Sequence, residues 1–539
     1  MSDVDAVVVG AGPNGLVAAN LLADAGWSVV VLEAQAEPGG AVRSAELVAP
    51  GYVADLFSAF YPLAVASPAL RALDLARDGL RWSHAPLALA HPLPDGRAAV
   101  LSRDLDETAA GLDAFAPGDG DAWRSLYGDW QATRGGIVDA LFTPFPPVRA
   151  GLRLGRTLGL SGLARSARLG LLPVRRLAEE RFGGEGGALL LAGNTLHSDL
   201  SPDTAGGGFF GWLLMSLGQE HGFPVPVGGA GELTAALVRR LERVGGSLRC
   251  GTRVDRVLVR DGRAVGVRTA SGEEVGVRRA VLADVGAPAL YRGLLADVAL
   301  PEFVHRALER FQYDHATVKV DWAMSGPVPW TSPDARRAGT VHVADGLDEL
   351  TRTAAQLASG VVPDAPYLIV GQMTTADSTR SPAGTESMWA YAHVPQRVTH
   401  DAGGDIGGTW DAAEGERFAD RMQARIERLA PGFGDRVLGR HVFTPPMLEA
   451  ADENLVGGAI NGGTAQLHQQ LVFRPVPGLG RPETPVRGLY LASASAHPGG
   501  GVHGAPGANA AAAALGEKRV WSRFTHAALA GLTRRIGSG

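Results

Sequence analysis

Apolar residues at the start of the chain fall into three blocks that glycine separates. Residues 7–9 form a β-branched run, which is typical of a buried parallel strand. Residues 16–25 follow as an apolar stretch of helical length that stops at Gly26. A second β-branched run spans residues 29–32 and ends at Glu33. The pattern predicts a strand, a tight turn, a helix and a second parallel strand.

Two later regions repeat this kind of patterning. Residues 231–244 have helical periodicity, and turns of the sequence RDGR and SGEE join the short alternating segments after them, as in a hairpin meander. Residues 281–284 then predict another buried strand. Near the far end, residues 486–492 predict a strand, and residues 505–515 predict a helix of strong helix formers. We therefore expect one α/β unit assembled from distant parts of the chain.

The first turn carries a phosphate-binding pattern. Gly10, Gly12 and Gly15 have the spacing GxGxxG, with Pro13 and Asn14 between the last two glycines. Glycine lets the backbone approach a pyrophosphate at a helix N-terminus, where free N–H groups and the helix dipole favour negative charge. In a strand–turn–helix–strand frame, this pattern predicts dinucleotide binding.

The acid at the end of the second strand completes this fingerprint. Glu33, followed by Ala34, is placed to accept hydrogen bonds from a ribose diol. An acid at this position disfavours a 2′-phosphate, so NADP is not expected, whereas FAD and NAD both remain open on this motif. Gly39 and Gly40 form a second glycine turn directly afterwards, and Arg43 lies within reach of a phosphate.

A second glycine-rich loop, HPGGGVHG at residues 497–504, precedes the last predicted helix. Glycine there allows the backbone to lie flat against an aromatic ring system, and free N–H groups stabilise negative charge on the pyrimidine edge of a reduced flavin. With a single nucleotide loop in the chain, FAD is favoured over NAD, and FAD is long enough to reach both loops. This adds four candidate cofactor-binding residues: Ser495, Gly501, Val502 and Asn509.

These stretches resemble the FAD-dependent phytoene desaturase-related superfamily, which includes carotenoid desaturases, carotene ketolases and retinol saturase and, more distantly, the amine oxidases. The closest resemblance is to its branch of pyridine nucleotide-disulphide oxidoreductase domain-containing proteins. It rests on the N-terminal loop and on residues 224–284, 444–475 and 488–515. The resemblance implies FAD as the cofactor, and it implies that the backbone of Val254 holds the adenine.

The resemblance also implies the fold. The expected class is α/β, with a Rossmann-type, glutathione-reductase-like FAD-binding domain and a discontinuous mixed α+β substrate domain. The FAD-binding domain would comprise residues 1–75, 224–290 and 481–520. The substrate domain would comprise residues 76–223 and 291–480, and residues 521–539 would form a C-terminal tail.

His497 and Lys319 are the candidate catalytic residues. His497 could transfer a proton while hydride moves to or from the flavin, or it could only cap backbone groups. Distant amine oxidases use a lysine near the flavin to hold a water, but Lys319 lies in an alternating strand and could instead point to solvent. No metal-ligand spacing such as HExxH occurs, so no metal site is expected. Surface or packing roles are expected for His197, His393, His468 and Arg474.

The composition limits the binding partners and the cellular location that we expect. The net charge of −6 gives no reason to expect nucleic acid. The single cysteine, Cys250, excludes internal disulfides and a redox dithiol and fits a reducing, cytoplasmic location. The N-terminus is acidic where a secretory signal would be basic.

One basic segment stands out. Residues 140–178 contain seven arginines, no Asp or Glu, and interspersed leucines. Such a segment could lie on the inner face of an anionic membrane as a peripheral contact, or it could form a solvated helical lid over the pocket. The sequence predicts no particular oligomeric state.

The resemblance implies an FAD-dependent oxidoreductase of the desaturase or dehydrogenase type. It would act on C–C or C=C bonds of an apolar small molecule, such as a polyene, isoprenoid or lipid-like compound, by hydride exchange with the flavin. Desaturation, saturation, isomerisation and ketolation all fit, because the chemistry belongs to the cofactor. One alternative is oxidation of a C–N bond, as in amine oxidases. Another is a flavin-holding protein with an interaction role rather than catalysis.

Overall fold

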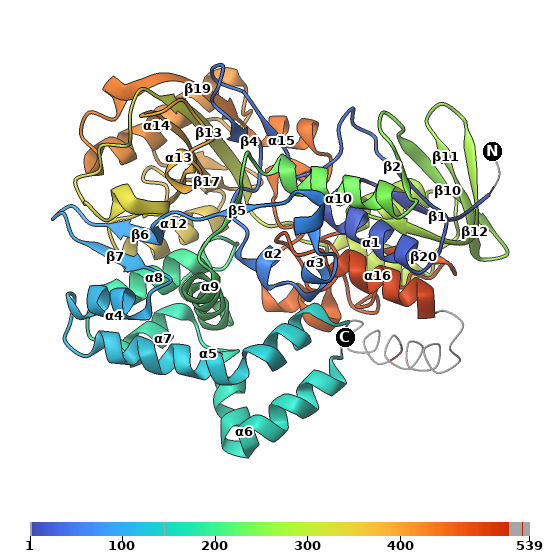
Figure 1. The fold of residues 1–539 in the computed structure, drawn as a ribbon, viewed down its shortest axis with the longest axis horizontal. Helices are drawn as coiled ribbons and strands as arrows, with labels where there is room; N and C mark the ends of the chain where they lie inside the picture. Colours follow the sequence, from blue (N-terminus) through green and yellow to red (C-terminus); the bar gives the residue numbers. More distant parts are fainter. Residues whose placement is uncertain (1–2, 145, 517–530, 532–539) are drawn as a thin grey trace.

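Two seven-stranded sheets organise the molecule (Figure 1). The computed structural model describes residues 3–144, 146–516 and 531, so the proposed tail 521–539 lies outside the described residues except for residue 531. The first sheet has the strand order β10-β11-β12-β1-β2-β9, and β20 pairs with β12. Its strands are β1 (Val4–Val9), β2 (Val29–Leu32), β9 (Ser247–Arg249), β10 (Val254–Arg260), β11 (Arg263–Thr269), β12 (Glu274–Ala283) and β20 (Leu489–Leu491).

The first sheet is parallel at its centre. β1 pairs in parallel with β2 and β12, while β10, β11 and β12 form the antiparallel meander that the turns predicted. All of its strands fall within residues 1–75, 224–290 and 481–520, the ranges proposed for the FAD-binding domain. Helices α1, α10 and α16 lie together against this sheet (Figure 1). They span Pro13–Asp24, Gly231–Arg243 and Ala505–Gly516.

Helices α1 and α16, which lie far apart in the sequence, cross in close contact. A Cβ atom added at Gly507 would lie 1.9 Å from the carbonyl oxygen of Asn14. Glycine is therefore required for the two backbones to approach this closely. The contact brings the first turn and the loop before α16 side by side (Figure 1).

The second sheet has the strand order β19-β13-β17-β16-β14-β6-β7. Its strands all fall in the proposed substrate domain: β6 (Leu87–Pro92), β7 (Ala98–Leu101), β13 (Ala316–Met324), β14 (Ala338–Val343), β16 (Leu368–Gln372), β17 (Glu386–Val394) and β19 (Val437–Phe443). Alternation with period two gives β13 two different faces. Val318, Val320 and Trp322 pack into one hydrophobic core with side chains of α14 (Ala412–Leu429), whereas Thr317 and Lys319 point to the opposite side.

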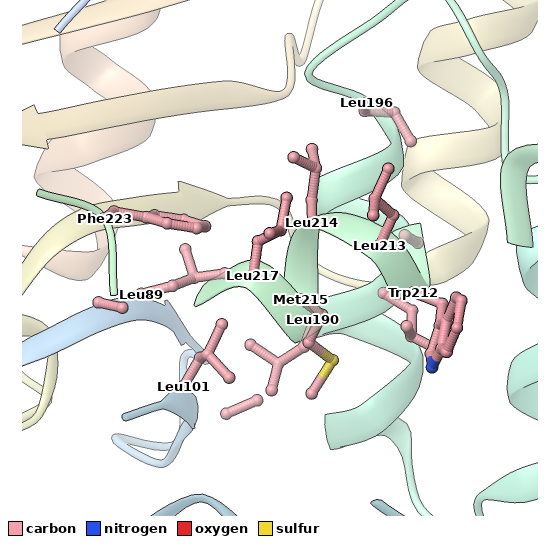
Figure 2. Close-up of a cluster of buried hydrophobic side chains, with 14 of the residues drawn as sticks. Leu89, Leu101, Leu190, Leu196, Trp212, Leu213, Leu214, Met215, Leu217 and Phe223 are labelled. Atoms are coloured by element: carbon pink, nitrogen blue, oxygen red, sulfur yellow. The ribbon is translucent and has the colours of Figure 1, made fainter. Parts of the chain in front are cut away.

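A helical layer covers the end of the second sheet (Figure 1). Figure 2 shows Leu190 of α8 and Met215 of α9 packed against Leu89 and Leu101 of β6 and β7. This apolar cluster fixes the helices on the sheet. The layer consists of α4 (Leu105–Asp113), α5 (Asp119–Phe142), α6 (Val148–Leu169), α7 (Val174–Arg181), α8 (Glu185–Thr195) and α9 (Gly207–His221).

Shorter elements complete the fold. The remaining helices are α2 (Pro62–Ala66), α3 (Pro68–Ala72), α11 (Glu302–Glu309), α12 (Leu347–Ala358), α13 (Met373–Ala376) and α15 (Pro445–Ala451). Two-residue strands pair as β3 (Ser44–Ala45) with β4 (Ala54–Asp55), β5 (Trp82–Ser83) with β8 (Val225–Pro226), and β15 (Val361–Val362) with β18 (His400–Asp401).

Helix α6 carries most of the basic segment predicted at residues 140–178. It projects from the helical layer (Figure 1) and exposes Leu152 and Leu160, with 60% and 89% of their surface accessible. The backbone leaves the helical region at Gly159, where φ is 62°, so the helix is interrupted rather than continuous. Among the described residues, no helix has the length and apolar character needed to span a bilayer.

Candidate active site

A cavity of about 340 Å³ lies between the two sheets. Residues 12–14 of the first turn and residues 500–502 of the loop before α16 both line it, so the two loops border one space, as expected from the sequence. We call the lining residues from the first sheet and its loops the nucleotide wall. We call the lining residues of β13, β14, β16 and β17 the sheet floor: Thr317, Lys319, Thr340, Ile369, Trp389 and Tyr391.

The first turn has the geometry of a phosphate loop. Gly10 has a φ of 94°, and a Cβ atom at Gly15 would lie 2.2 Å from the carbonyl oxygen of Gly10. Only glycine fits either position. Pro13 begins α1, where the missing N–H costs nothing, and Asn14 follows it with its side-chain oxygen buried and without a hydrogen-bond partner among the described residues.

Glu33 braces this turn from the end of β2. Its carboxylate accepts hydrogen bonds from the N–H groups of Ala11 (2.7 Å) and Gln35 (2.8 Å), while Ala34 is exposed beside it. The N–H of Thr252 donates to the Glu33 carbonyl at 2.7 Å, which brings the start of β10, and with it Val254, to the end of β2. The proposed ribose and adenine residues are therefore neighbours, although they lie outside the cavity lining.

The second glycine turn packs on the first. The Gly39 N–H donates to the Ala11 carbonyl at 2.9 Å, and a Cβ at Gly40 would lie 3.3 Å from the Cα of Gly12. Arg43 does not line the cavity. Its guanidinium instead donates to the carbonyls of Gly40 (3.0 Å) and Ala451 (2.7 Å), so it holds the turn in place.

The loop before α16 completes the nucleotide wall. Ser495 donates from its hydroxyl to the Gly462 carbonyl (2.9 Å) and accepts from the Ala287 N–H (3.1 Å). Gly501 has a φ of 98° and lines the cavity beside Val502. Asn509 is buried in α16, and its side-chain nitrogen has no hydrogen-bond partner among the described residues.

The sequence analysis missed two acids that line the cavity, Asp284 and Asp452. Asp284 accepts the Gly15 N–H at 2.7 Å, and burial raises its pKa to about 8, with further contributions from Asp452 and Glu33. Burial also raises the pKa of Asp452, which lines the same cavity. A signal for Asp284 was present, because it ends the predicted strand 281–284, and the carboxyl ends of parallel strands meet at one edge of a sheet.

Lys319 lies on the sheet floor and is buried, so the alternative that it points to solvent is excluded. Its side chain is 4% exposed, and its ammonium donates to both carboxylate oxygens of Asp321 at 2.5 Å. The same nitrogen lies 6.0 Å from the ring centroids of Trp389 and Phe443. The cavity therefore contains a cation that is paired and enclosed by aromatic rings.

His497 is buried but is not among the described residues that line the cavity. Neither of its ring nitrogens has a hydrogen-bond partner in the described part of the chain. Burial, and then the charge of Arg474, lower its pKa to about 4. The structure thus leaves His497 without direct access to a substrate in this cavity. Its neighbour His503 accepts the Ala505 N–H at 3.1 Å and caps α16.

The remaining expected surface or packing residues differ from one another. His468 is exposed, as expected, whereas Arg474 is 1% exposed. Arg474 donates to the carbonyls of Asn461 and Ala494, at 2.7 Å each, so it ties two loops of the site together. His197 lies on the cavity wall. The described residues hold no cluster of three or more His, Cys, Asp or Glu side chains suited to a metal ion, although parts of the chain lie outside them.

The fold and the nucleotide wall define an FAD-dependent oxidoreductase with a Rossmann-type FAD-binding domain. Residues 14–355 match the family described as flavin containing amine oxidoreductase, and the chain belongs to this family. The chain is also similar to the mouse protein named pyridine nucleotide-disulfide oxidoreductase domain-containing protein 2, with 29% identity over 94% of this chain and 93% of that one.

Two further similarities agree with the resemblance seen in the sequence. The neurosporene-forming phytoene desaturase of Rhodobacter capsulatus is 26% identical, over 92% of this chain and 91% of its own length. The solved structure of an oxidoreductase from Methanosarcina mazei has a TM-score of 0.62 at 16% identity, covering 95% of this chain and 99% of that one. The resemblance to the desaturase-related superfamily, the α/β fold class and FAD as the cofactor are thereby confirmed.

The residues present fit FAD. The glycine turns leave no room for side chains at the positions where a pyrophosphate would approach. A buried acceptor on Asn14 and a buried donor on Asn509 lack protein partners in the described residues, which suits a ligand that offers both kinds of group.

Proposed function

We propose that the protein exchanges hydride between its flavin and a C–C or C=C bond of an apolar, elongated substrate, such as a polyene, isoprenoid or lipid-like compound. The observation that carries this proposal is the composition of the cavity beyond the nucleotide wall. Its lining there is dominated by apolar and aromatic side chains: Phe60, Leu63, Phe210, Leu214, Phe223, Ile369 and Trp389. The names of the phytoene desaturase relatives support the same substrate class.

The proposed cofactor contacts follow the nucleotide wall. The turns at residues 10–15 and 39–40 would hold the pyrophosphate, with Arg43 fixing the second turn. Glu33 would meet the ribose, and the backbone near Ala34 and Val254 would meet the adenine. Bound FAD supplies hydride acceptance or donation, and Ser495, Gly501, Val502 and Asn509 would position its ring end.

Lys319 is the catalytic group that we retain from the sequence analysis. The Asp321 carboxylate holds its ammonium at the sheet floor, and the surrounding rings exclude water from the pair. His497 is not retained, because it is buried and is not among the described residues that line the cavity. Excluding water raises the strength of electrostatic interactions around the reacting carbons.

Oxidation of a C–N bond is the second candidate. The family description favours it, and so do the rings of Trp389 and Tyr391, which stack with centroids 6.0 Å apart on the sheet floor. Against it stands the predominantly apolar lining of the cavity beyond the nucleotide wall.

Anaerobic reduction of the flavin separates the two candidates. Purified protein is mixed without oxygen with phytoene or farnesol in detergent and, separately, with putrescine or benzylamine, and the flavin absorbance is followed. We expect bleaching by an isoprenoid and none by the amines. Bleaching by the amines alone would replace the proposed reaction with C–N oxidation, and protein that takes up no FAD would refute both.

We further propose a peripheral contact between α6 and an anionic membrane surface. The helix combines exposed Leu152 and Leu160 with a run of arginines and no acid of its own. Basic, apolar helices of this type bind at the lipid interface. Such a contact would place the protein where an apolar substrate is dissolved. The test is co-sedimentation with vesicles of phosphatidylglycerol, compared with vesicles of phosphatidylcholine, which we expect to bind far less.

A further inference from the structure

A partly buried histidine at the apolar end of the cavity, His197, pairs with a buried one, His342. His197 follows α8 by two residues and lines the cavity, and its Nε2 lies 2.8 Å from the Nε2 of His342 on β14. Burial lowers the pKa of His197 to about 4, and it lowers the pKa of His342 further, together with the charges of His197 and His91. Both imidazoles are therefore neutral near pH 7, and one must donate to the other.

The surroundings of His342 decide which ring donates. Its Nδ1 is buried and has no hydrogen-bond partner among the described residues. The backbone of Gly193 packs against this nitrogen so closely that a Cβ there would lie 2.2 Å from it. The nearby Tyr367 hydroxyl already donates to the Gly193 carbonyl at 3.0 Å.

A proton on the Nδ1 of His342 would thus be a buried donor without an acceptor, which is rarer and more costly than an unpaired acceptor. We assign the proton of His342 to Nε2, from which it donates to the Nε2 of His197. His197 must then carry its own proton on Nδ1. That nitrogen forms no hydrogen bond with a described residue, and the ring borders the cavity.

From this arrangement we propose that His197 presents an N–H donor to the substrate, and that the substrate is an oxygenated apolar molecule with a hydroxyl or carbonyl oxygen at the end far from Lys319. This inference rests on the proposed function and narrows its substrate class. A pure hydrocarbon would leave the donor buried and unpaired, at a cost that an oxygen acceptor removes.

The sheet floor sets the spacing between the two ends. Lys319 pairs across the strands with Tyr391, Tyr391 with Ile369, and Ile369 with His342. Cross-strand partners share one face of a sheet, so these four side chains form a row beneath the cavity. Three strand spacings separate the ends of the row by roughly 14 Å. A substrate that reaches from Lys319 to His197 is therefore elongated.

The test compares two ligands of the same skeleton, farnesol and farnesene, which differ in the presence of an oxygen acceptor. Each is titrated into oxidised, FAD-loaded protein, and binding is followed by the change in the flavin absorption spectrum. We expect wild-type protein to bind farnesol about tenfold more tightly than farnesene, the size of one hydrogen bond to a buried group. Equal affinity for the two ligands would overturn the assignment of the donor.

Variants locate the donor. His197→Phe is expected to lose the preference for farnesol while keeping its affinity for farnesene, and His197→Gln, whose amide retains an N–H, is expected to keep part of it. His393→Phe is the matched control, because His393 is also buried on the second sheet but lies outside the lining of this cavity. Loss of the preference in Tyr391→Phe instead would show that the Tyr391 hydroxyl is the donor and would overturn the proposal.

The outcomes also separate this inference from the proposed function. If both ligands bind but with equal affinity, only the role of His197 fails. If neither ligand perturbs the flavin spectrum, the apolar-substrate function itself fails, and the inference falls with it. Retention of flavin and of the thermal midpoint in each variant shows that the variant is folded.

Discussion

The nucleotide wall and the sheet floor enclose one cavity but are built in different ways. The nucleotide wall is made mostly of backbone: glycine turns, helix N-termini and carbonyls, braced by Glu33, which lies 22 residues from its partner Ala11. The sheet floor is made of side chains, among them Lys319, which forms a buried ion pair with Asp321. Next to the sheet floor lies a histidine pair whose members are 145 residues apart. In our proposal the first region holds the cofactor and the second contacts the substrate.

The buried ion pair is where the sheet floor is most easily broken. Replacing Asp321 with Ala would leave the Lys319 ammonium buried without a counter-charge, which costs about 3–5 kcal/mol of the free energy of unfolding. Urea denaturation of the FAD-loaded variant measures this loss. The double variant Lys319→Met, Asp321→Leu should recover most of the stability, because apolar residues of similar size replace such pairs well. A loss below about 1 kcal/mol in the single variant would mean that water reaches the pair.

On the nucleotide wall, the corresponding weak point is a backbone contact. Gly507→Ala places a Cβ against the Asn14 carbonyl and should cost about 1–3 kcal/mol, with a lower flavin content because the two loops move apart. The matched control is Gly516→Ala at the other end of α16, where no described residue lies within 4 Å of the added atom. Thermal unfolding and the ratio of flavin to protein absorbance test both. Equal effects at the two glycines would contradict the close approach of α1 and α16.

The same contrast explains which features could be predicted from the sequence. The spacing of Gly10, Gly12 and Gly15 with Glu33 predicted the phosphate turn, because every part of it lies within one strand–helix–strand unit. The strands, helices and meander of the first sheet followed from local periodicity in the same way. The prediction that the first turn and the loop before α16 lie close together rested on the length of FAD. The crossing of α1 and α16 at Gly507 is consistent with that prediction.

The sheet floor could not be predicted in this manner. His197 looked like a packing residue, since nothing nearby in sequence shows that β14 brings His342 to it. Lys319 and Asp321 are two residues apart, yet alternation alone did not show that both faces of β13 are buried, one in the core with α14 and the other at the cavity. His497 was favoured by its place in a glycine-rich loop, but it is not among the described residues that line the cavity. These positions are set by tertiary contacts, which local pattern does not encode.

The nucleotide wall also differs from the sheet floor in that Asp284 should make the stability of the protein depend on pH. Burial raises the pKa of Asp284 to about 8, so the folded protein keeps a proton that the unfolded chain releases near its ordinary value of 3.8. The stability of the wild type should therefore fall as the pH rises from about 4 to 8. Asp284→Asn keeps an acceptor for the Gly15 N–H and removes this dependence.

We expect Asp284→Asn to be more stable than the wild type by at least about 1 kcal/mol at pH 8, with a difference that shrinks as the pH falls and is small near pH 4. Thermal unfolding at several pH values gives the comparison. The opposite sign, with the wild type more stable at pH 8, would show that Asp284 is held as a carboxylate by the turn. Asp405→Asn serves as the control, because Asp405 lies outside both the nucleotide wall and the sheet floor.

The smallest effect is expected outside both regions, on α6. Leu160 is 89% exposed, so Leu160→Ser should change the free energy of unfolding by no more than about 0.5 kcal/mol and leave flavin content unchanged. If α6 meets an anionic membrane, the same substitution reduces co-sedimentation with phosphatidylglycerol vesicles, because apolar area is lost from the interface. Leu438→Ser, at an exposed leucine on β19, should have no effect on vesicle binding. If Leu160→Ser lowers the stability but not the vesicle binding, Leu160 packs within the protein. That outcome would contradict a membrane contact through Leu160.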